Sequence, residues 1–187
     1  NEGYSSPLRI LHVVGGMNRG GVETWLMHVL RRIDRNRFHF DFLVHNNRQC
    51  AYDEEIRSLG ARILPCPHPS KPWVYARNFY RLIRQYGPYD VVHSHVHHFS
   101  GFVLGLSRAL GVPKRIAHTH NDTLKVDTSG SFFRRVYLRV MKQQIFTHAT
   151  VGLAASVTAA KALYGPYWEK DPARSEEHTS ELQSRQS

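Results

Sequence analysis

The chain has 187 residues, 41% of them hydrophobic, which is the usual size of one domain with its own core. Its formal net charge of +10 favours a polyanionic partner, such as a nucleic acid, an anionic membrane surface or a phosphorylated substrate. Two cysteines without Cys-x-x-Cys spacing exclude a disulfide framework and indicate a reducing compartment, and no run of about 20 apolar residues predicts a membrane span.

Residues 9–33 predict a strand, a glycine loop and a helix. The strand is the aliphatic run from Arg9 to Val14, and apolar residues at steps of three and four predict the helix from Val22. Between them, four glycines in the seven positions 15–21 let a ligand approach the backbone amides. The amino end of the following helix favours an anion there, most simply a phosphate.

This loop matches neither of two common phosphate-binding patterns. It lacks Gly-x-Gly-x-x-Gly, and the second strand ends in Val44-His-Asn-Asn without an acidic residue, so a dinucleotide is not predicted. Gly20-Gly-Val-Glu at the helix entrance also lacks the Gly-Lys-Ser/Thr of nucleoside triphosphatases. A tight turn without a ligand remains the alternative to a phosphate site.

Strands and helices continue to alternate along the rest of the chain. We expect further strands at 38–44, 61–64, 90–95, 115–118 and 149–153, and helices at 52–59, 74–86, 99–110, 131–146 and 155–164. This predicts an α/β fold, a single Rossmann-like parallel sheet with helices on both faces. Ligands of such folds bind at the carboxyl ends of the strands, so we expect a site built from four loops, at 15–21, 45–48, 95–100 and 118–122.

Two of the predicted helices carry further patterns. In helix 99–110, Gly101 and Gly105 begin a smooth ridge that we expect to pack closely on the sheet. In helix 131–146, one side gathers apolar residues and the other basic residues, namely Phe133, Val136, Tyr137 and Val140 against Arg134, Arg135, Arg139 and Lys142. This helix either rests on an anionic membrane or packs on the core with a solvated basic face.

The end of the chain has a different character. Residues 174–184, Arg-Ser-Glu-Glu-His-Thr-Ser-Glu-Leu-Gln-Ser, resemble the in-frame translation of a widely used sequencing adapter. We therefore expect a Rossmann-like domain at 1–173 and an artefactual, disordered polar tail at 174–187, which has no part in the fold.

Six histidines gather at two predicted strand ends: His93, His95, His97, His98, His118 and His120. Alternate residues of a strand share a face, so His93 lies on the side of His95, and His118 on the side of His120. Three interpretations are open: a metal site, strand-end histidines without a ligand, and recognition of sugar hydroxyls and phosphate. For a metal site, the following loop offers only Asp122 and Asp127 as further ligands.

Three motifs, in order, resemble one known family: Ile10-Leu-His-Val-Val-Gly-Gly-Met-Asn-Arg-Gly-Gly-Val-Glu, Asp90-Val-Val-His-Ser-His and Arg115-Ile-Ala-His-Thr-His-Asn. They are similar to the amino-terminal domain of family 4 glycosyltransferases of the exopolysaccharide and capsule type, and the likeness extends from residue 9 to about 172. The resemblance implies one half of a GT-B fold that moves a sugar from a nucleotide-sugar donor to a glycan or polyprenyl-diphosphate-linked acceptor. It also implies retention of configuration and no required cofactor or metal.

The resemblance further implies roles for single residues. His118 matches a catalytic histidine that lines the acceptor and the transferred sugar. The residues implied in binding the donor diphosphate and substrate are Gly16, Gly20, Gly21, His95, His120 and Asn121. The family's donor-nucleotide domain would follow the last helix, so we expect a truncated, inactive half whose missing partner is the carboxyl-terminal GT-B domain.

Two other functions remain as alternatives, a metal-dependent hydrolase that uses the histidines and a basic nucleic-acid-binding module. Only the bulk charge supports the second, since no helix-turn-helix, ribonucleoprotein or zinc-finger pattern is present, so no nucleic-acid partner is expected. The expected location is cytoplasmic, with peripheral contact to the inner face of the cell membrane.

Overall fold

The computed structural model describes residues 6–120 and 131–164. Their strands form one six-stranded sheet in the order β3-β2-β1-β4-β5-β6. This is the strand order of the Rossmann fold, so the predicted α/β class is confirmed.

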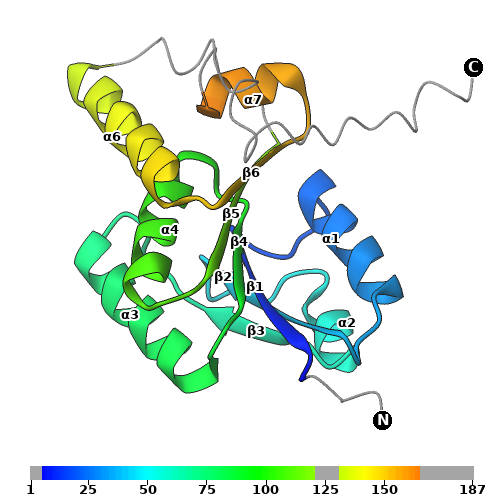
Figure 1. Ribbon diagram of the computed structural model, residues 1–187. Helices are drawn as coiled ribbons and strands as arrows, with labels where there is room; N and C mark the ends of the chain where they lie inside the picture. The colour runs from blue at the N-terminus through cyan, green and yellow to red at the C-terminus, as the bar shows by residue number, and fades with distance from the viewer. Residues whose placement is uncertain (1–5, 121–130, 165–187) are drawn as a thin grey trace, which may run out of the picture. The chain divides into compact units, whose positions relative to one another are not determined.

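The elements lie close to the expected bounds (Figure 1). The strands are β1 (Leu8–Val14), β2 (Phe38–Val44), β3 (Arg62–Pro65), β4 (Val91–Ser94), β5 (Lys114–Thr119) and β6 (Val151–Ala154). The helices are α1 (Gly21–Arg32), α2 (Asp53–Ser58), α3 (Pro72–Tyr86), α4 (Ser100–Ala109), α6 (Phe132–His148) and α7 (Val157–Tyr164), and a short 3-10 helix, η1 (His97–Phe99), precedes α4. The adapter-like tail lies outside the described residues.

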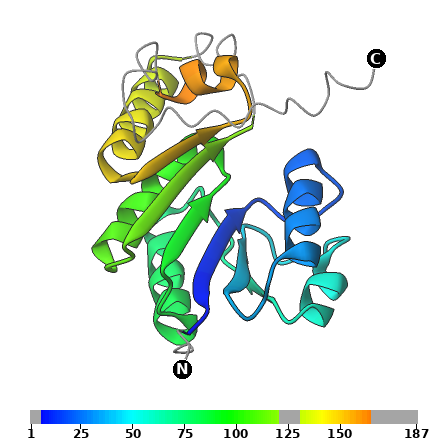
Figure 2. The same cartoon turned by 45° about the vertical axis from the view of Figure 1, so that its right-hand side comes forward.

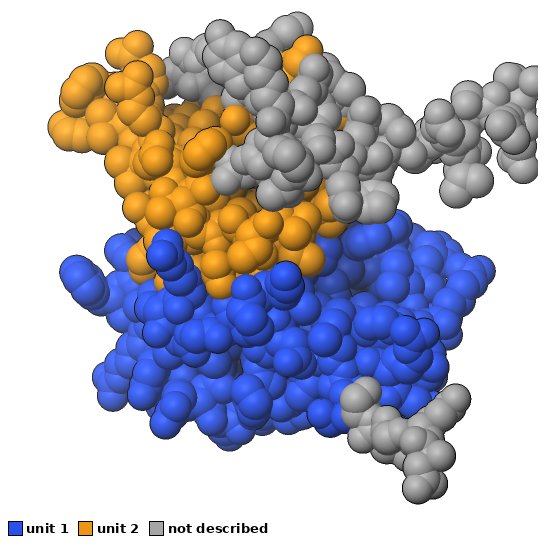
Figure 3. Space-filling view, viewed as in Figure 1, with its two compact units in different colours: residues 1–93, 106–114 blue, residues 94–105, 115–187 orange. Residues whose placement is uncertain are grey.

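The chain divides into two compact units (Figure 3). Unit 1 consists of Asn1–His93 and Leu106–Lys114, and unit 2 consists of Ser94–Gly105 and Arg115–Ser187. The glycine loop therefore belongs to unit 1, whereas His95, His118 and His120 belong to unit 2.

In unit 1, β2 is the central strand between β1 and β3, and both pairings are parallel. Helices α1 and α2 cover one face of these strands, and α3 covers the other (Figures 1 and 2). Because both faces are covered, β2 buries every residue from Phe40 to Val44. Phe38, Phe40, Phe42 and Val44 alternate along β2 with His39, Asp41 and Leu43, but this alternation does not correspond to a buried and an exposed face.

One charged residue, Asp41, lies among these buried side chains, and it is 0% exposed. The hydroxyl of Tyr89 donates to its Oδ2 at 2.8 Å, and the backbone N–H of Arg62 donates to its Oδ1 at 3.1 Å. The guanidinium groups of Arg62 and Arg9 lie at 3.3 Å and 3.7 Å from the carboxylate. Burial, together with the neighbouring carboxylate, raises the pKa of Tyr89. These contacts satisfy a charge that would otherwise be costly to bury.

In unit 2, β5 pairs with β6, and α6 packs against α4 through the glycines of the predicted ridge. A Cβ at Gly101 would collide with the carbonyl oxygen of Met141, and one at Gly105 would lie 3.3 Å from the ring of His148. The expectation that this ridge packs on the sheet is therefore wrong for both glycines. Gly101 lacks a side chain because the backbone of α6 approaches there, and Gly105 faces the side chains of His148 and Gln144.

The last helix is tied to the sheet of unit 2 by one tyrosine. The hydroxyl of Tyr164 lies 2.6 Å from the carbonyl oxygen of Ala117 and 2.9 Å from that of Leu153. These contacts join α7 to both β5 and β6. Within residues 6–120 and 131–164, no helix is both long enough and apolar enough to traverse a bilayer.

The contacts of Asp41 generate a stability prediction. Replacing Asp41 with alanine should lower the free energy of unfolding by about 3 kcal/mol, because a buried hydroxyl loses its acceptor and two guanidinium groups lose their negative partner. The matched control is Glu55→Ala, which removes an exposed carboxylate paired with Arg31 at 2.6 Å and should change stability far less. Urea unfolding followed by circular dichroism measures both changes, and equal losses would contradict the role of Asp41.

Candidate functional site

The glycine loop joins β1 to the amino end of α1, as its sequence predicts. Gly20 is the N-cap residue of α1, and no side chain forms a capping hydrogen bond to this end of the helix. The N–H groups of a first helical turn have no partners within the helix, and the helix dipole places partial positive charge beside them. Such a helix end can bind an anion, and the predicted phosphate site at this loop stays a prediction.

Gly20 and Gly21 differ in what surrounds them. A Cβ at Gly21 would meet nothing within 4 Å, so the space beside this amide is open. A Cβ at Gly20 would collide with the carboxylate of Glu23, which lies against the same end of the helix. An anion that binds at this helix end must therefore displace the Glu23 side chain, because the anion and the Glu23 carboxylate repel each other at close range.

Gly16 has a packing reason to be glycine. A Cβ at this position would collide with Nδ2 of Asn46 and lie 3.2 Å from Sγ of Cys50. The Asn46 amide in turn donates to the carbonyl oxygen of Gly15 at 3.2 Å, which joins the glycine loop to the loop after β2. The structure thus brings together two of the four predicted loops, and the role of Gly16 in binding a diphosphate stays a prediction.

The loop after β2 also borders a hollow of about 250 Å³ in unit 1. Arg48 lines this hollow, as the predicted loop implies, but so do Asp53 and Arg57 of α2, which sequence reasoning missed. Oδ1 of Asp53 is buried and has no hydrogen-bond partner among the described residues. Nearby, burial lowers the pKa of His45 to about 4, so its ring is neutral at pH 7, and its Nε2 lies 3.0 Å from the Tyr75 hydroxyl.

In unit 2, three of the six predicted histidines meet where β4 and β5 end, and we call them the histidine cluster: His95, His118 and His120. The ring centroids of His118 and His120 are 3.9 Å apart, and that of His95 lies 5.3 Å and 5.4 Å from them. Nδ1 of His95 lies 3.1 Å from Nε2 of His120, so one ring donates a hydrogen bond to the other. The predicted proximity of His118 and His120 is confirmed.

Burial sets the protonation state of one member of this cluster, His120. His118 is only 6% exposed, whereas His95 and His120 are half-buried. Burial lowers the pKa of His120 to about 4, so its ring is neutral at pH 7. A neutral imidazole offers one donor and one acceptor, which is the combination that binds sugar hydroxyls.

The backbone between β4 and α4 is held in an unusual conformation beside the cluster. His97 has a φ of 50°, in the left-handed region, and its Nδ1 lies 3.5 Å from the hydroxyl of Thr119. The hydroxyls of Ser94 and Ser100 are hydrogen-bonded at 2.8 Å across the same turn. Sequence reasoning missed these hydroxyls, since a single Ser or Thr carries no recognisable spacing. Strained backbone of this kind is typical of functional sites.

The histidine cluster also has the donor atoms of a metal site. One ring nitrogen from each histidine lies within 4.8 Å of the other two. In a tetrahedral zinc site the metal–nitrogen distance is about 2.0–2.1 Å, which places ligand nitrogens ~3.3 Å apart. The 3.1 Å separation between Nδ1 of His95 and Nε2 of His120 is near this value. Asn121 and the two predicted carboxylate ligands lie outside the described residues, so both interpretations stay open.

Known proteins match this chain at the level of sequence. The model of the glycosyl transferase 4-like domain matches residues 20–171. EpsF of Bacillus subtilis (strain 168), named as a glycosyltransferase, is 40% identical over 163 residues, which are 86% of this chain and 42% of EpsF. The capsular polysaccharide biosynthesis glycosyltransferase CapH of Staphylococcus aureus is 30% identical over 111 residues, 59% of this chain and 30% of CapH. The chain thus spans less than half the length of these relatives.

Solved structures match the fold. HepE (Alr3699) of Anabaena, crystallised in complex with UDP and glucose, matches with a TM-score of 0.57 at 15% identity, over 83% of this chain and 40% of HepE. At this identity the match shows the fold alone. The family model covers most of the chain, including the glycine loop from Gly20 onward and the whole histidine cluster. The chain therefore belongs to the glycosyl transferase 4-like domain family.

Proposed function

We propose that this chain is the acceptor-side half of a retaining glycosyltransferase. The whole protein would move a sugar from a nucleotide-sugar to a glycan or a polyprenyl-diphosphate-linked acceptor. The family match carries this proposal, because it includes Gly20 and Gly21 of the glycine loop and the whole histidine cluster in one segment. The UDP and glucose bound to HepE support a nucleotide-sugar donor, and the name of CapH supports a polysaccharide product.

Sugar transfer needs two things that these residues can supply. Negative charge that develops on the leaving nucleoside diphosphate has to be stabilised, and the acceptor hydroxyl has to be held near the reacting carbon. We assign the first task in part to the amino end of α1 at Gly20 and Gly21, with Gly16 shaping the loop. We assign the second to His118, whose buried ring can hydrogen-bond sugar hydroxyls.

The remaining site residues are assigned supporting roles. His95 and His120 hydrogen-bond to each other beside His118 and would contact the sugar or its phosphate, as would Asn121. Because a helix end and imidazole rings can perform these tasks, we propose that the reaction needs no metal cofactor. A lipid-linked acceptor would place the protein in the cytoplasm, at the inner face of the cell membrane.

One wall of the donor site is proposed to lie in a second domain. The chain spans 42% of EpsF, and a nucleotide-sugar bound to the glycine loop alone would lack groups that hold the base and neutralise the diphosphate. We therefore propose that the 187-residue chain does not catalyse transfer by itself.

A metal-dependent hydrolase is the second candidate function. The observation in its favour is the set of three ring nitrogens within 4.8 Å in the histidine cluster. Metal hydrolases need further ligands and an open coordination position for water. A nucleic-acid-binding role has only the net charge in its favour.

The open space beside Gly21 allows a test of the phosphate site. In the whole protein, meaning this chain joined to its natural downstream sequence, Gly21→Leu should lower kcat/KM for transfer by about tenfold or more, because the side chain would cover the amides that stabilise the leaving group. The fold should persist, since a Cβ at this position meets nothing within 4 Å.

The matched control for that test is His28→Leu, which places the same side chain on the exposed surface of α1, seven residues further along the helix. Both variants should melt at the wild-type temperature in circular dichroism. Full turnover by Gly21→Leu would remove the phosphate site from the proposal.

The role of His118 generates a second prediction. In the whole protein, His118→Ala should lower kcat/KM by about 100-fold, because the lost ring orients the sugar and acceptor in the transition state, while the affinity for the nucleoside diphosphate should change little. The control is His28→Ala, which removes an exposed histidine on α1.

The proposal that the reaction needs no metal has its own test. Wild-type turnover should survive dialysis against EDTA.

Two outcomes would contradict this proposal. Unchanged turnover of His118→Ala would remove this histidine from the site. A loss of wild-type activity in EDTA that zinc restores would favour the metal-dependent alternative on the same three histidines.

A further inference from the structure

One side of α6 is exposed although it is apolar. Its buried residues are Leu138 and Ile145, whereas Phe132 is 66% and Phe133 82% exposed. Three more large apolar residues on the helix are close to half exposed: Val136, Tyr137 and Val140. The apolar side identified from the sequence is thus not the side that packs on the core. Exposed apolar residues gathered in this way mark a contact surface.

Basic residues border these apolar side chains. Arg135 and Arg139 are exposed one turn apart, and Lys142 follows them. The whole segment 131–150 contains four Lys or Arg residues and no Asp or Glu. We call Phe132, Phe133, Val136, Tyr137, Val140, Arg135, Arg139 and Lys142 together the α6 surface.

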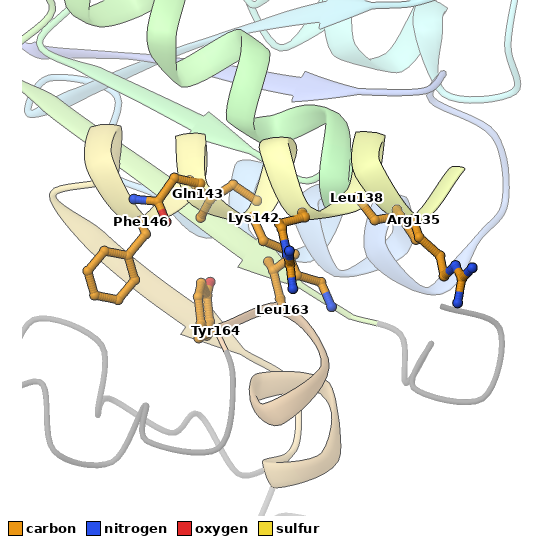
Figure 4. Close-up of a pocket in the computed structure, with 9 residues that line it drawn as sticks. Arg135, Leu138, Lys142, Gln143, Phe146, Leu163 and Tyr164 are labelled. Atoms are coloured by element: carbon orange, nitrogen blue, oxygen red, sulfur yellow. The ribbon is translucent and has the colours of Figure 1, made fainter. Parts of the chain in front are cut away.

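Two hollows in unit 2 share Arg135 and Arg139 as lining residues. One, of about 390 Å³, lies between α6 and α7, and its lining includes Arg135, Arg139, Lys142 and Tyr164. Figure 4 shows Arg135 and Lys142 extending from α6 on one side of it, with Leu163 and Tyr164 of α7 on the other. The second, of about 420 Å³, is lined by Phe132 and Val136 together with the same two arginines. Each hollow therefore combines positive charge with apolar walls.

This combination fits one partner better than others. The α6 surface carries cations without a single acid, so charge complementarity favours a partner whose surface is anionic. An anionic bilayer presents phosphate groups above acyl chains, so cations that lie beside protruding aromatic rings match it. Long basic side chains can place their charges in the headgroup layer while their stems cover apolar surface.

We propose that the α6 surface docks unit 2 on an anionic phospholipid membrane. The exposed Phe132 and Phe133 insert below the headgroups, and Arg135 and Arg139 bind lipid phosphates. This deepens the proposed function, on which it rests for the membrane-bound acceptor, by naming the surface and the lipid charge that bring the protein to that acceptor.

The test is sedimentation of the 187-residue chain with vesicles, which requires no transfer activity. Binding should occur on phosphatidylcholine vesicles that contain phosphatidylglycerol and not on pure phosphatidylcholine. It should weaken as salt shortens the Debye length from ~10 Å at 0.1 M to ~3 Å at 1 M. Arg135→Ala with Arg139→Ala should reduce partitioning by about tenfold or more, and Phe132→Ser with Phe133→Ser should reduce it similarly.

Helix α3 supplies matched controls in unit 1. Arg81→Ala with Arg84→Ala removes two exposed arginines, and Trp73→Ser removes an aromatic side chain that is 88% exposed. Neither control should change vesicle binding. In the whole protein, transfer to a water-soluble acceptor should be unaffected by the four α6 substitutions, so failure of membrane docking and failure of the proposed function are distinguishable.

Several results would overturn the proposal. Equal binding to neutral vesicles, no binding to anionic vesicles, or an equal loss in the α3 controls would each do so. Binding by the 187-residue chain that disappears in the whole protein would show that another domain covers the α6 surface. A dimer that Phe132→Ser with Phe133→Ser dissociates, without vesicle binding, would assign this surface to a second copy of the chain.

Discussion

Parallel strand pairing decides where this chain presents its polar groups. β1 runs beside β2 as far as the pair Val14 and Val44, and β5 runs beside β6 as far as Thr119 and Ala154. Within each unit, the loops that follow paired strands therefore begin at one edge. In unit 1 this edge carries the glycine loop, and in unit 2 it carries the histidine cluster. The proposed chemistry depends on this arrangement, because loops supply the groups that contact the substrate.

Much of this could be predicted from the sequence, because its signals are local. Apolar residues at steps of three and four identify α1, and glycine closes α2, since Gly60 adopts a φ of 84° that other residues disfavour. The His-x-His spacing of His118 and His120 places both rings on one side of a strand end, and the structure has them 3.9 Å apart. Each of these predictions depended only on residues that are close together in the sequence.

What could not be predicted depends on contacts between distant segments. Asp41 interrupts an aromatic strand without any local reason, and its partners Arg62 and Tyr89 come from other elements. The sequence of α6 identifies its apolar side, but only the burial of Leu138 and Ile145 shows that another side of the helix meets the core and that the apolar side stays exposed. A helical pattern describes which residues share a side and not which side meets the core.

The central claim is that this chain supplies the acceptor-side half of a transferase, and that binding of the donor also needs groups from a second domain. It is tested most directly by single-turnover transfer with a panel of nucleotide-sugars and lipid-diphosphate acceptors. The 187-residue chain is compared with residues 1–173 joined to their natural downstream sequence. Transfer is expected only from the joined protein, faster by several orders of magnitude, because leaving-group stabilisation accounts for several kcal/mol of the barrier. Comparable rates from both proteins would contradict the claim.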